Sequence, residues 1–252
     1  MENNDGSFFG RHQFLLYRLF SLTGVVPIGG YVIIHLLTNS TVVDSPQMFQ
    51  KNVNTIHSLG MFLPLVEWTF IFLPLIYHAL IGWAIISGSM PNLGRYHYAS
   101  NFRYTLQRAT GMIAFFFIIW HVWHMHSMAA PIGGGNFDPH HAASSTAIAL
   151  IPLWVKGLYL VGVLAAAYHL ANGIWTFGLT WGLWTSPKAM RRASFVCLML
   201  GLGVSGLGVT ALVGFGTLDI PEAKKVETRM DEKQRLLNGQ SPSAAVAKDH
   251  AP

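Results

Sequence analysis

The chain has 252 residues, of which 52% are hydrophobic and only 11% are charged. This composition is typical of membrane proteins and argues against a soluble globular domain. The single cysteine, Cys197, excludes intramolecular disulfides, thiolate metal clusters and covalent haem attachment through two cysteines. A net charge of +5 does not indicate nucleic-acid binding here, because the basic residues flank apolar segments in short clusters.

Five apolar segments are long enough to cross a bilayer, whose hydrocarbon core of about 30 Å needs about 20 helical residues. They lie at residues 18–38, 63–89, 106–128, 151–179 and 193–217. The polar stretch before the first segment has no signal-peptide character, so we expect an uncleaved anchor. The sequence therefore predicts an all-α membrane protein whose transmembrane domain covers residues 1–217.

Basic residues lie mainly on one side of these predicted spans. They comprise Arg11 and Arg18 before the first span, Arg95, Arg103 and Arg108 around the second connection, and Lys188, Arg191 and Arg192 in the fourth. The other two connections carry only Lys51. The positive-inside rule then places the N-terminus in the cytoplasm, and the odd number of spans places the C-terminus outside. A bacterial or archaeal cytoplasmic membrane is expected, since no transit-peptide signature is present.

Residues 218–252 form a polar C-terminal tail that follows the last apolar segment. Its acidic and basic residues are interspersed, which is typical of a solvated segment. The pattern allows a short helix over residues 221–237. We assign no chemistry to this tail from the sequence.

Four histidines each lie in a separate predicted span, at His35, His78, His121 and His169. Their surroundings repeat in order: a Thr-Gly pair, a first histidine, and then Tyr-His followed by glycine four residues after the histidine and by tryptophan. The chain has thus duplicated a two-helix unit. Imidazole in hydrocarbon is costly unless it is partnered, so intramembrane histidines are candidate functional residues. Four of them in a repeated frame indicate buried haem.

Depth in the membrane predicts how these histidines pair. At about 1.5 Å per residue, His35 and His121 come late in helices that run outward, whereas His78 and His169 come late in helices that run inward. We therefore expect two stacked bis-histidine b haems in a four-helix bundle, with the fifth helix packed at its periphery. His78 and His169 form the inner pair, nearer the cytoplasm, and His35 and His121 the outer pair. Gly82 and Gly173 follow the inner histidines by four residues on the same helix face, where a missing side chain leaves room for the macrocycle.

Two other interpretations of the histidines stay open. Each imidazole could bind a neighbouring backbone group while small residues serve only helix packing, as in a haem-free transporter or structural anchor. Copper or zinc could instead bind at His121, His124 and His126, although solvated interfacial positions explain the last two more simply. We favour haem because all four spans carry one histidine each, at matched depths.

Four motifs cover nearly all of residues 11–215. They are Arg18-Leu-Phe-Ser-Leu-Thr-Gly24 with Pro27 and His35, Phe72-Leu-Pro-Leu-Ile-Tyr-His78, Gln107-Arg-Ala-Thr-Gly111 with Trp120-His121, and His169-Leu-Ala-Asn-Gly-Ile-Trp175. In this combination the chain resembles the five-helix, two-haem cytochrome b subunit that anchors succinate dehydrogenases and fumarate reductases. The loop 129–150 and the tail after residue 217 match no motif of that family.

The resemblance implies a subunit with no active site for succinate itself, so the sequence leaves open whether the chain counts as an enzyme on its own. Its partners would be a flavoprotein and an iron–sulfur protein on the cytoplasmic face. Electrons would pass through the haem at His78 and His169, then the haem at His35 and His121, to a quinone, with menaquinone the usual acceptor. A di-haem subunit of another quinone-linked dehydrogenase is the nearest alternative.

Three further site residues follow from the same resemblance. Arg18 and Arg108, at helix starts near the inner haem, are expected to bind haem propionates. Glu67 is the only acidic residue within the first four spans. We expect it to transfer protons linked to quinone chemistry, unless it is an interfacial acid that reaches headgroup water.

Overall fold

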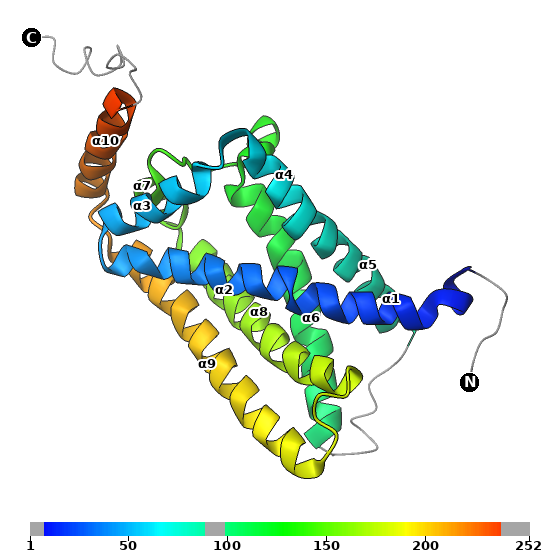
Figure 1. Cartoon of the computed structure of the whole chain (residues 1–252). Coiled ribbons are helices and arrows are strands. Elements are labelled where there is room, and N and C mark those ends of the chain that lie inside the picture. Colours follow the sequence, from blue (N-terminus) through cyan, green and yellow to red (C-terminus); the bar gives the residue numbers. More distant parts are fainter. Residues whose placement is uncertain (1–7, 89–98, 238–252) are drawn as a thin grey trace, which may run out of the picture. The chain divides into compact units, whose positions relative to one another are not determined.

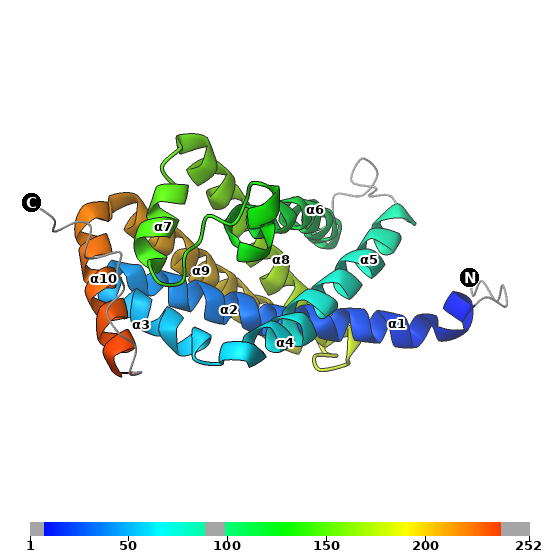
Figure 2. The same cartoon turned by 90° about the horizontal axis from the view of Figure 1, so that it is seen from above.

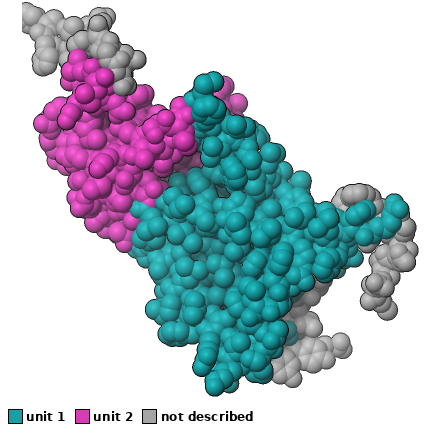
Figure 3. All heavy atoms as spheres, in the orientation of Figure 1, with its two compact units in different colours: residues 1–37, 61–119, 158–209 teal, residues 38–60, 120–157, 210–252 magenta. Residues whose placement is uncertain are grey.

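The computed structural model describes residues 8–88 and 99–237, and these residues form helices, turns and loops without a strand. They divide into two compact units, which are coloured separately in Figure 3. Unit 1 comprises Met1–Leu37, Met61–Ile119 and Leu158–Val209, and unit 2 comprises Thr38–Gly60, Trp120–Gly157 and Thr210–Pro252. Arg95 of the predicted basic cluster and the tail beyond residue 237 lie outside the described residues.

Long apolar helices occupy all five predicted spans (Figure 1). They are α1 (Phe8–Val25) with α2 (Pro27–Ser40), α4 (Leu63–Glu67) with α5 (Leu73–Ser87), α6 (Ala99–Met125), α8 (Leu153–Thr180) and α9 (Pro187–Thr217). Within the described residues, four of these regions are long and apolar enough to cross a membrane. The helix α6 is also long, at 27 residues, but two arginines and two histidines interrupt its apolar sequence. The prediction of an all-α membrane protein is confirmed.

Prolines interrupt two of these spans. Pro27 begins α2 directly after the turn residue Val26, because proline has no N–H to continue the helical ladder. Ahead of Pro74, residues Trp68–Phe72 form the π-helical segment η3, in which the N–H of Leu73 donates to the carbonyl five residues before it. The wider turn avoids the clash of a proline ring with the carbonyl four residues earlier. Glu67 is the last residue before this segment.

Unit 2 contains most of the shorter elements. These are η1 (Thr41–Val43), α3 (Pro46–His57), η4 (Ser127–Ile132), α7 (Ala142–Ala149) and α10 (Ile220–Leu237), and the short η2 (Gly60–Phe62) follows α3. Figure 2 shows α10 beside α3 and α7, and it packs against both. The helix α10 lies where the sequence allowed a short helix. The fully buried Ala142 and Ala143 let α10 approach α7 closely.

Candidate functional site

The structure brings His78 of α5 and His169 of α8 together within unit 1. Their ring centroids are 6.2 Å apart and their planes are nearly perpendicular, at 88°. Two imidazoles that bind one metal ion through bonds of about 2 Å have ring centres about 6 Å apart. At this separation both rings could bind one haem iron, so the two histidines are candidate ligands of the same iron.

Both rings are oriented by the same kind of main-chain contact. The Nδ1 atom of His78 lies 3.0 Å from the carbonyl oxygen of Phe20, and that of His169 lies 3.1 Å from the carbonyl oxygen of Gln107. A neutral imidazole that donates from Nδ1 keeps its lone pair on Nε2. Ligating histidines are usually oriented in this way by their second nitrogen.

A glycine faces each ring on the neighbouring helix. A Cβ atom at Gly24 would lie 2.5 Å from Cε1 of His78, and one at Gly111 would lie 2.8 Å from Cε1 of His169. Gly24 lies four residues after Phe20, and Gly111 lies four residues after Gln107, the residues whose carbonyls contact the two histidines. The Thr-Gly motif of each repeat thus contacts the histidine of the Tyr-His motif in the same repeat, and the motifs alone did not predict this contact.

The two glycines predicted to leave room for a macrocycle lie beside the residues that supply these carbonyls. A Cβ atom at Gly82 would lie 3.4 Å from the ring of Phe20, and one at Gly173 would lie 3.6 Å from Nε2 of Gln107. These are ordinary van der Waals distances, so the surrounding protein atoms alone do not require glycine at either position. That these glycines leave room for a macrocycle stays a prediction.

A polar network that the sequence did not predict joins α6, α8 and α9 next to His169. Gln107 Nε2 donates to the carbonyl oxygen of His169 at 3.1 Å, and Asn172 Nδ2 donates to Gln107 Oε1 at 2.7 Å. Arg103 then donates from Nε to Asn172 Oδ1 at 2.9 Å and from a terminal nitrogen to Ser194 Oγ at 3.0 Å. Arg103 therefore belongs to the surroundings of the histidine pair.

The two arginines expected to bind propionates have aromatic partners. The guanidinium of Arg18 lies over the rings of Phe14 and Trp181, 4.9 Å from each centroid. Arg108 donates to the hydroxyl of Tyr104 at 2.5 Å. Both side chains are half-buried, and their binding to propionates stays a prediction.

His35 lies in unit 1 and His121 in unit 2, so the pairing of these two histidines also stays a prediction. The ring of His35 stacks on Tyr31 at 5.4 Å between centroids, and the Tyr31 hydroxyl lies 3.5 Å from its Nδ1. Glu67 lies close enough to Tyr31 to interact with it electrostatically. Tyr31 thus lies beside His35 and within electrostatic range of Glu67.

Two of the three histidines in the copper or zinc interpretation have contacts of their own. The ring of His124 stacks on Trp120 at 4.5 Å, and His126 accepts a hydrogen bond from the N–H of Met128. Among residues 8–88 and 99–237, no three His, Cys, Asp or Glu side chains are grouped to hold a metal ion. The grouping of side chains therefore does not support that interpretation.

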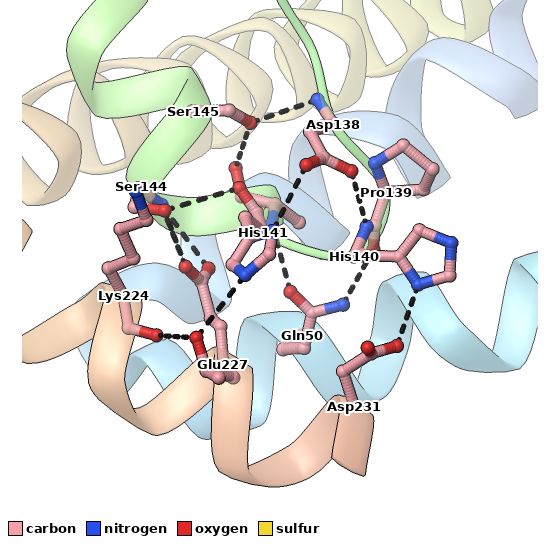
Figure 4. Close-up of polar contacts among 12 residues, drawn as sticks. Gln50, Asp138, Pro139, His140, His141, Ser144, Ser145, Lys224, Glu227 and Asp231 are labelled. Atoms are coloured by element: carbon pink, nitrogen blue, oxygen red, sulfur yellow. Dashed lines mark hydrogen bonds and ion pairs between the residues drawn. The ribbon is translucent and has the colours of Figure 1, made fainter. Parts of the chain in front are cut away.

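A second polar cluster lies in unit 2, where the tail helix α10 meets α7 (Figure 4). Glu227 is fully buried, and its carboxylate accepts hydrogen bonds from the N–H of Ala143 at 2.5 Å and from the hydroxyl of Ser144 at 2.6 Å. These groups belong to the first turn of α7, where a carboxylate satisfies otherwise unpaired N–H groups. The helix α10 is therefore an integral part of unit 2.

Ion pairs and hydrogen bonds of two loop histidines surround this cluster (Figure 4). His140 Nδ1 lies 2.8 Å from Asp231, and His141 Nδ1 lies 3.0 Å from Asp138. Burial raises the pKa of Asp138, but hydrogen bonds from His140 and His141 and the charges of both rings outweigh it, so the pKa lies below its usual value. His140, through Asp231, and His141, through the Thr228 hydroxyl at 3.3 Å, thus join the loop to α10.

Membrane-crossing helices that carry histidines in a repeated frame define a class, the transmembrane cytochrome b subunits of respiratory dehydrogenases. The sequence profile described as "Succinate dehydrogenase/Fumarate reductase transmembrane subunit" matches residues 89–209. The succinate dehydrogenase cytochrome b558 subunit of Bacillus subtilis (strain 168) is 37% identical over 207 residues, which are 82% of this chain and 98% of that protein. The chain belongs to the family of transmembrane cytochrome b subunits of succinate dehydrogenase and fumarate reductase, as its motifs predicted.

Proposed function

We propose that this chain is the membrane anchor of a succinate:quinone oxidoreductase, holds two b haems and connects an iron–sulfur subunit to a quinone. The observation that carries the proposal is the facing pair of His78 and His169, whose Nδ1 atoms are both engaged by backbone carbonyls. When bound, the haems would supply one-electron carriers inside the bilayer. The chain's own task is to orient the ligands and to exclude water around them.

The residues would divide between two haem sites. His78 and His169 would bind the inner iron, with Gly82 and Gly173 leaving room for the macrocycle. Arg18 and Arg108 would bind its propionates, a role that suits guanidinium groups at the ends of spans. His35 and His121 would bind the outer iron. The Tyr31 hydroxyl lies beside Nδ1 of His35 and supports this role, because it leaves the other ring nitrogen, Nε2, for the iron.

Quinone chemistry requires protons, and Glu67 would transfer them to menaquinone or another quinone near the outer haem. Glu67 interacts electrostatically with Tyr31, whose hydroxyl lies 3.5 Å from His35 Nδ1, and this supports the role. The adjoining π-helical segment is a second support, since such segments often occur at functional sites. Glu67→Gln should abolish most quinone-linked turnover and leave both haem spectra intact. Normal turnover in this variant would remove Glu67 from the proposal.

The chain would lie in a bacterial or archaeal cytoplasmic membrane with its N-terminus in the cytoplasm and its C-terminus outside. Residues 1–217 would form the transmembrane domain and residues 218–252 the outer tail. The flavoprotein and iron–sulfur subunits would dock on the cytoplasmic side, where Arg191 and Arg192 at the start of α9 are exposed. These basic residues also follow the positive-inside rule.

The test is redox-titrated absorbance of the complex purified from membranes, with the four histidines replaced by alanine one at a time. His78→Ala and His169→Ala should each remove the same haem, and His35→Ala and His121→Ala should each remove the other. His12→Ala, at an exposed position in α1, is the matched control and should leave both haems. Absence of a bis-histidine b spectrum in the unaltered complex would instead indicate a haem-free anchor.

A further inference from the structure

We infer that Arg103 is a positioning residue for His169, and that its charge raises the reduction potential of the haem proposed at His78 and His169. This inference rests on the proposed function, because it requires a haem at that pair. Arg103 lies in α6 on the same helix as Gln107, and it reaches His169 through the side chains of Asn172 and Gln107.

Neutral groups hold the guanidinium of Arg103. It donates to the amide oxygen of Asn172 and the hydroxyl of Ser194, and it lies 3.9 Å from the centroid of the Trp175 ring. In the part of the chain that the structure describes, no carboxylate forms an ion pair with it. Because these partners solvate the charge without neutralising it, and arginine does not deprotonate in proteins, a full positive charge stays in unit 1.

Two side-chain amides lead from this charge to the histidine. Asn172 accepts from Arg103 and donates to Gln107, which in turn donates to the carbonyl oxygen of His169. Asn172 is only 5% exposed, so the series of hydrogen bonds is shielded from water and its aligned dipoles polarise one another. The Gln107 carbonyl also accepts from His169 Nδ1, so one residue holds both the main chain and the ring of the histidine.

The electrostatic consequence has a definite sign. Reduction adds one negative charge to a haem, so a fixed positive charge nearby favours the reduced form and raises the potential. Loss of the Arg103 charge should therefore lower the potential of the inner haem and leave the outer haem unchanged.

The test compares Arg103→Gln with Arg103→Lys by redox-titrated absorbance of the complex purified from membranes. Arg103→Gln should lower the reduction equilibrium constant of the inner haem at least tenfold, about 59 mV for a one-electron couple. Arg103→Lys keeps the charge and should restore most of the potential. Arg11→Gln removes an exposed positive charge from α1 and is the matched control, with no expected shift.

A second variant covers the case in which Arg103→Gln takes up no inner haem. Asn172→Asp is isosteric and places a carboxylate against Arg103, so it should lower the inner potential in the same direction. An unchanged inner potential in Asn172→Asp overturns the inference. The inference is also overturned if Arg103→Gln and Asn172→Asp both lose the inner haem while Arg103→Lys keeps it, since Arg103 would then serve folding alone. A haem-free unaltered complex would instead refute the proposed function.

Discussion

The two repeats in unit 1 hold their second histidine in the same way but surround it with different chemistry. In the first repeat, the His78 ring stacks on Phe20, with centroids 4.3 Å apart and planes at 13°, and binds the carbonyl of the same residue. In the second repeat, His169 binds the carbonyl of Gln107, whose side chain continues to Asn172. An aromatic contact in one repeat is replaced by a polar network in the other.

The difference shows which part of the site the duplication preserves. A backbone carbonyl is present whatever the side chain, so the position shared by Phe20 and Gln107 can diverge without loss of the histidine's orientation. The facing glycine is preserved in both repeats because any larger residue would meet the ring. Side-chain divergence then gives each histidine its own electrostatic surroundings.

Alanine at the facing glycines should have the largest effect. Gly24→Ala would place Cβ 2.5 Å from the His78 ring and Gly111→Ala 2.8 Å from the His169 ring, so each ring must move away from the carbonyl that it binds. Both variants should lose most of the haem proposed at His78 and His169, and Gly24→Ala more of it. Absorbance per purified protein measures the loss. Gly30→Ala, where a Cβ meets no atom within 4 Å, is the control. Full haem content in both variants would contradict the shared geometry.

Leucine at the divergent position should separate the two repeats. Gln107→Leu leaves the buried Asn172 amide without its acceptor, at a cost of about 1–3 kcal/mol. Phe20→Leu removes only the ring stack, at about 0.5–1.5 kcal/mol. Thermal release of the inner haem from the detergent-solubilised complex should therefore occur at a lower temperature in Gln107→Leu. Equal release temperatures would mean that the polar network adds nothing to the second repeat.

Valine at the two threonines should have a smaller effect. The Thr23 hydroxyl donates to the Phe20 carbonyl at 3.0 Å, whereas Thr110 lies 3.4 Å from the Gln107 carbonyl and bonds Leu106 at 2.6 Å. Thr23→Val should thus alter the His78 contact, by about 0.5–1.5 kcal/mol, more than Thr110→Val alters that of His169. The inner-haem midpoint potential of each variant measures this, and a larger shift in Thr110→Val would reverse the assignment.

A change outside both repeats should leave the inner haem unaffected. Glu227→Ala removes the acceptor for the buried groups of Ala143 and Ser144, at about 1–3 kcal/mol for each unsatisfied group. Hydrogen exchange should increase in α7 and α10 while the inner-haem potential stays constant. Glu227→Gln keeps one acceptor oxygen and should show a smaller increase. A shifted inner potential would show that the site is not confined to the repeats.

Much of this protein follows from local sequence patterns. Apolar segments of membrane length predicted the helices, because burial in lipid requires a continuous run of apolar residues. The repeated Tyr-His and Thr-Gly motifs predicted a duplicated unit, and their combination predicted the family to which the chain belongs. These properties are encoded within single segments and need no knowledge of which segments meet.

The contacts between segments were decided only by the tertiary structure. The carbonyls of Phe20 and Gln107 carry no sequence signal, since every residue has one, and only the packing of neighbouring helices selects the turn that meets a histidine. The path from Arg103 through Asn172 to Gln107 depends in the same way on which faces of α6 and α8 meet. A polar tail gave no sign that Glu227 would be buried, because a buried carboxylate is stable only where folding brings donors to it.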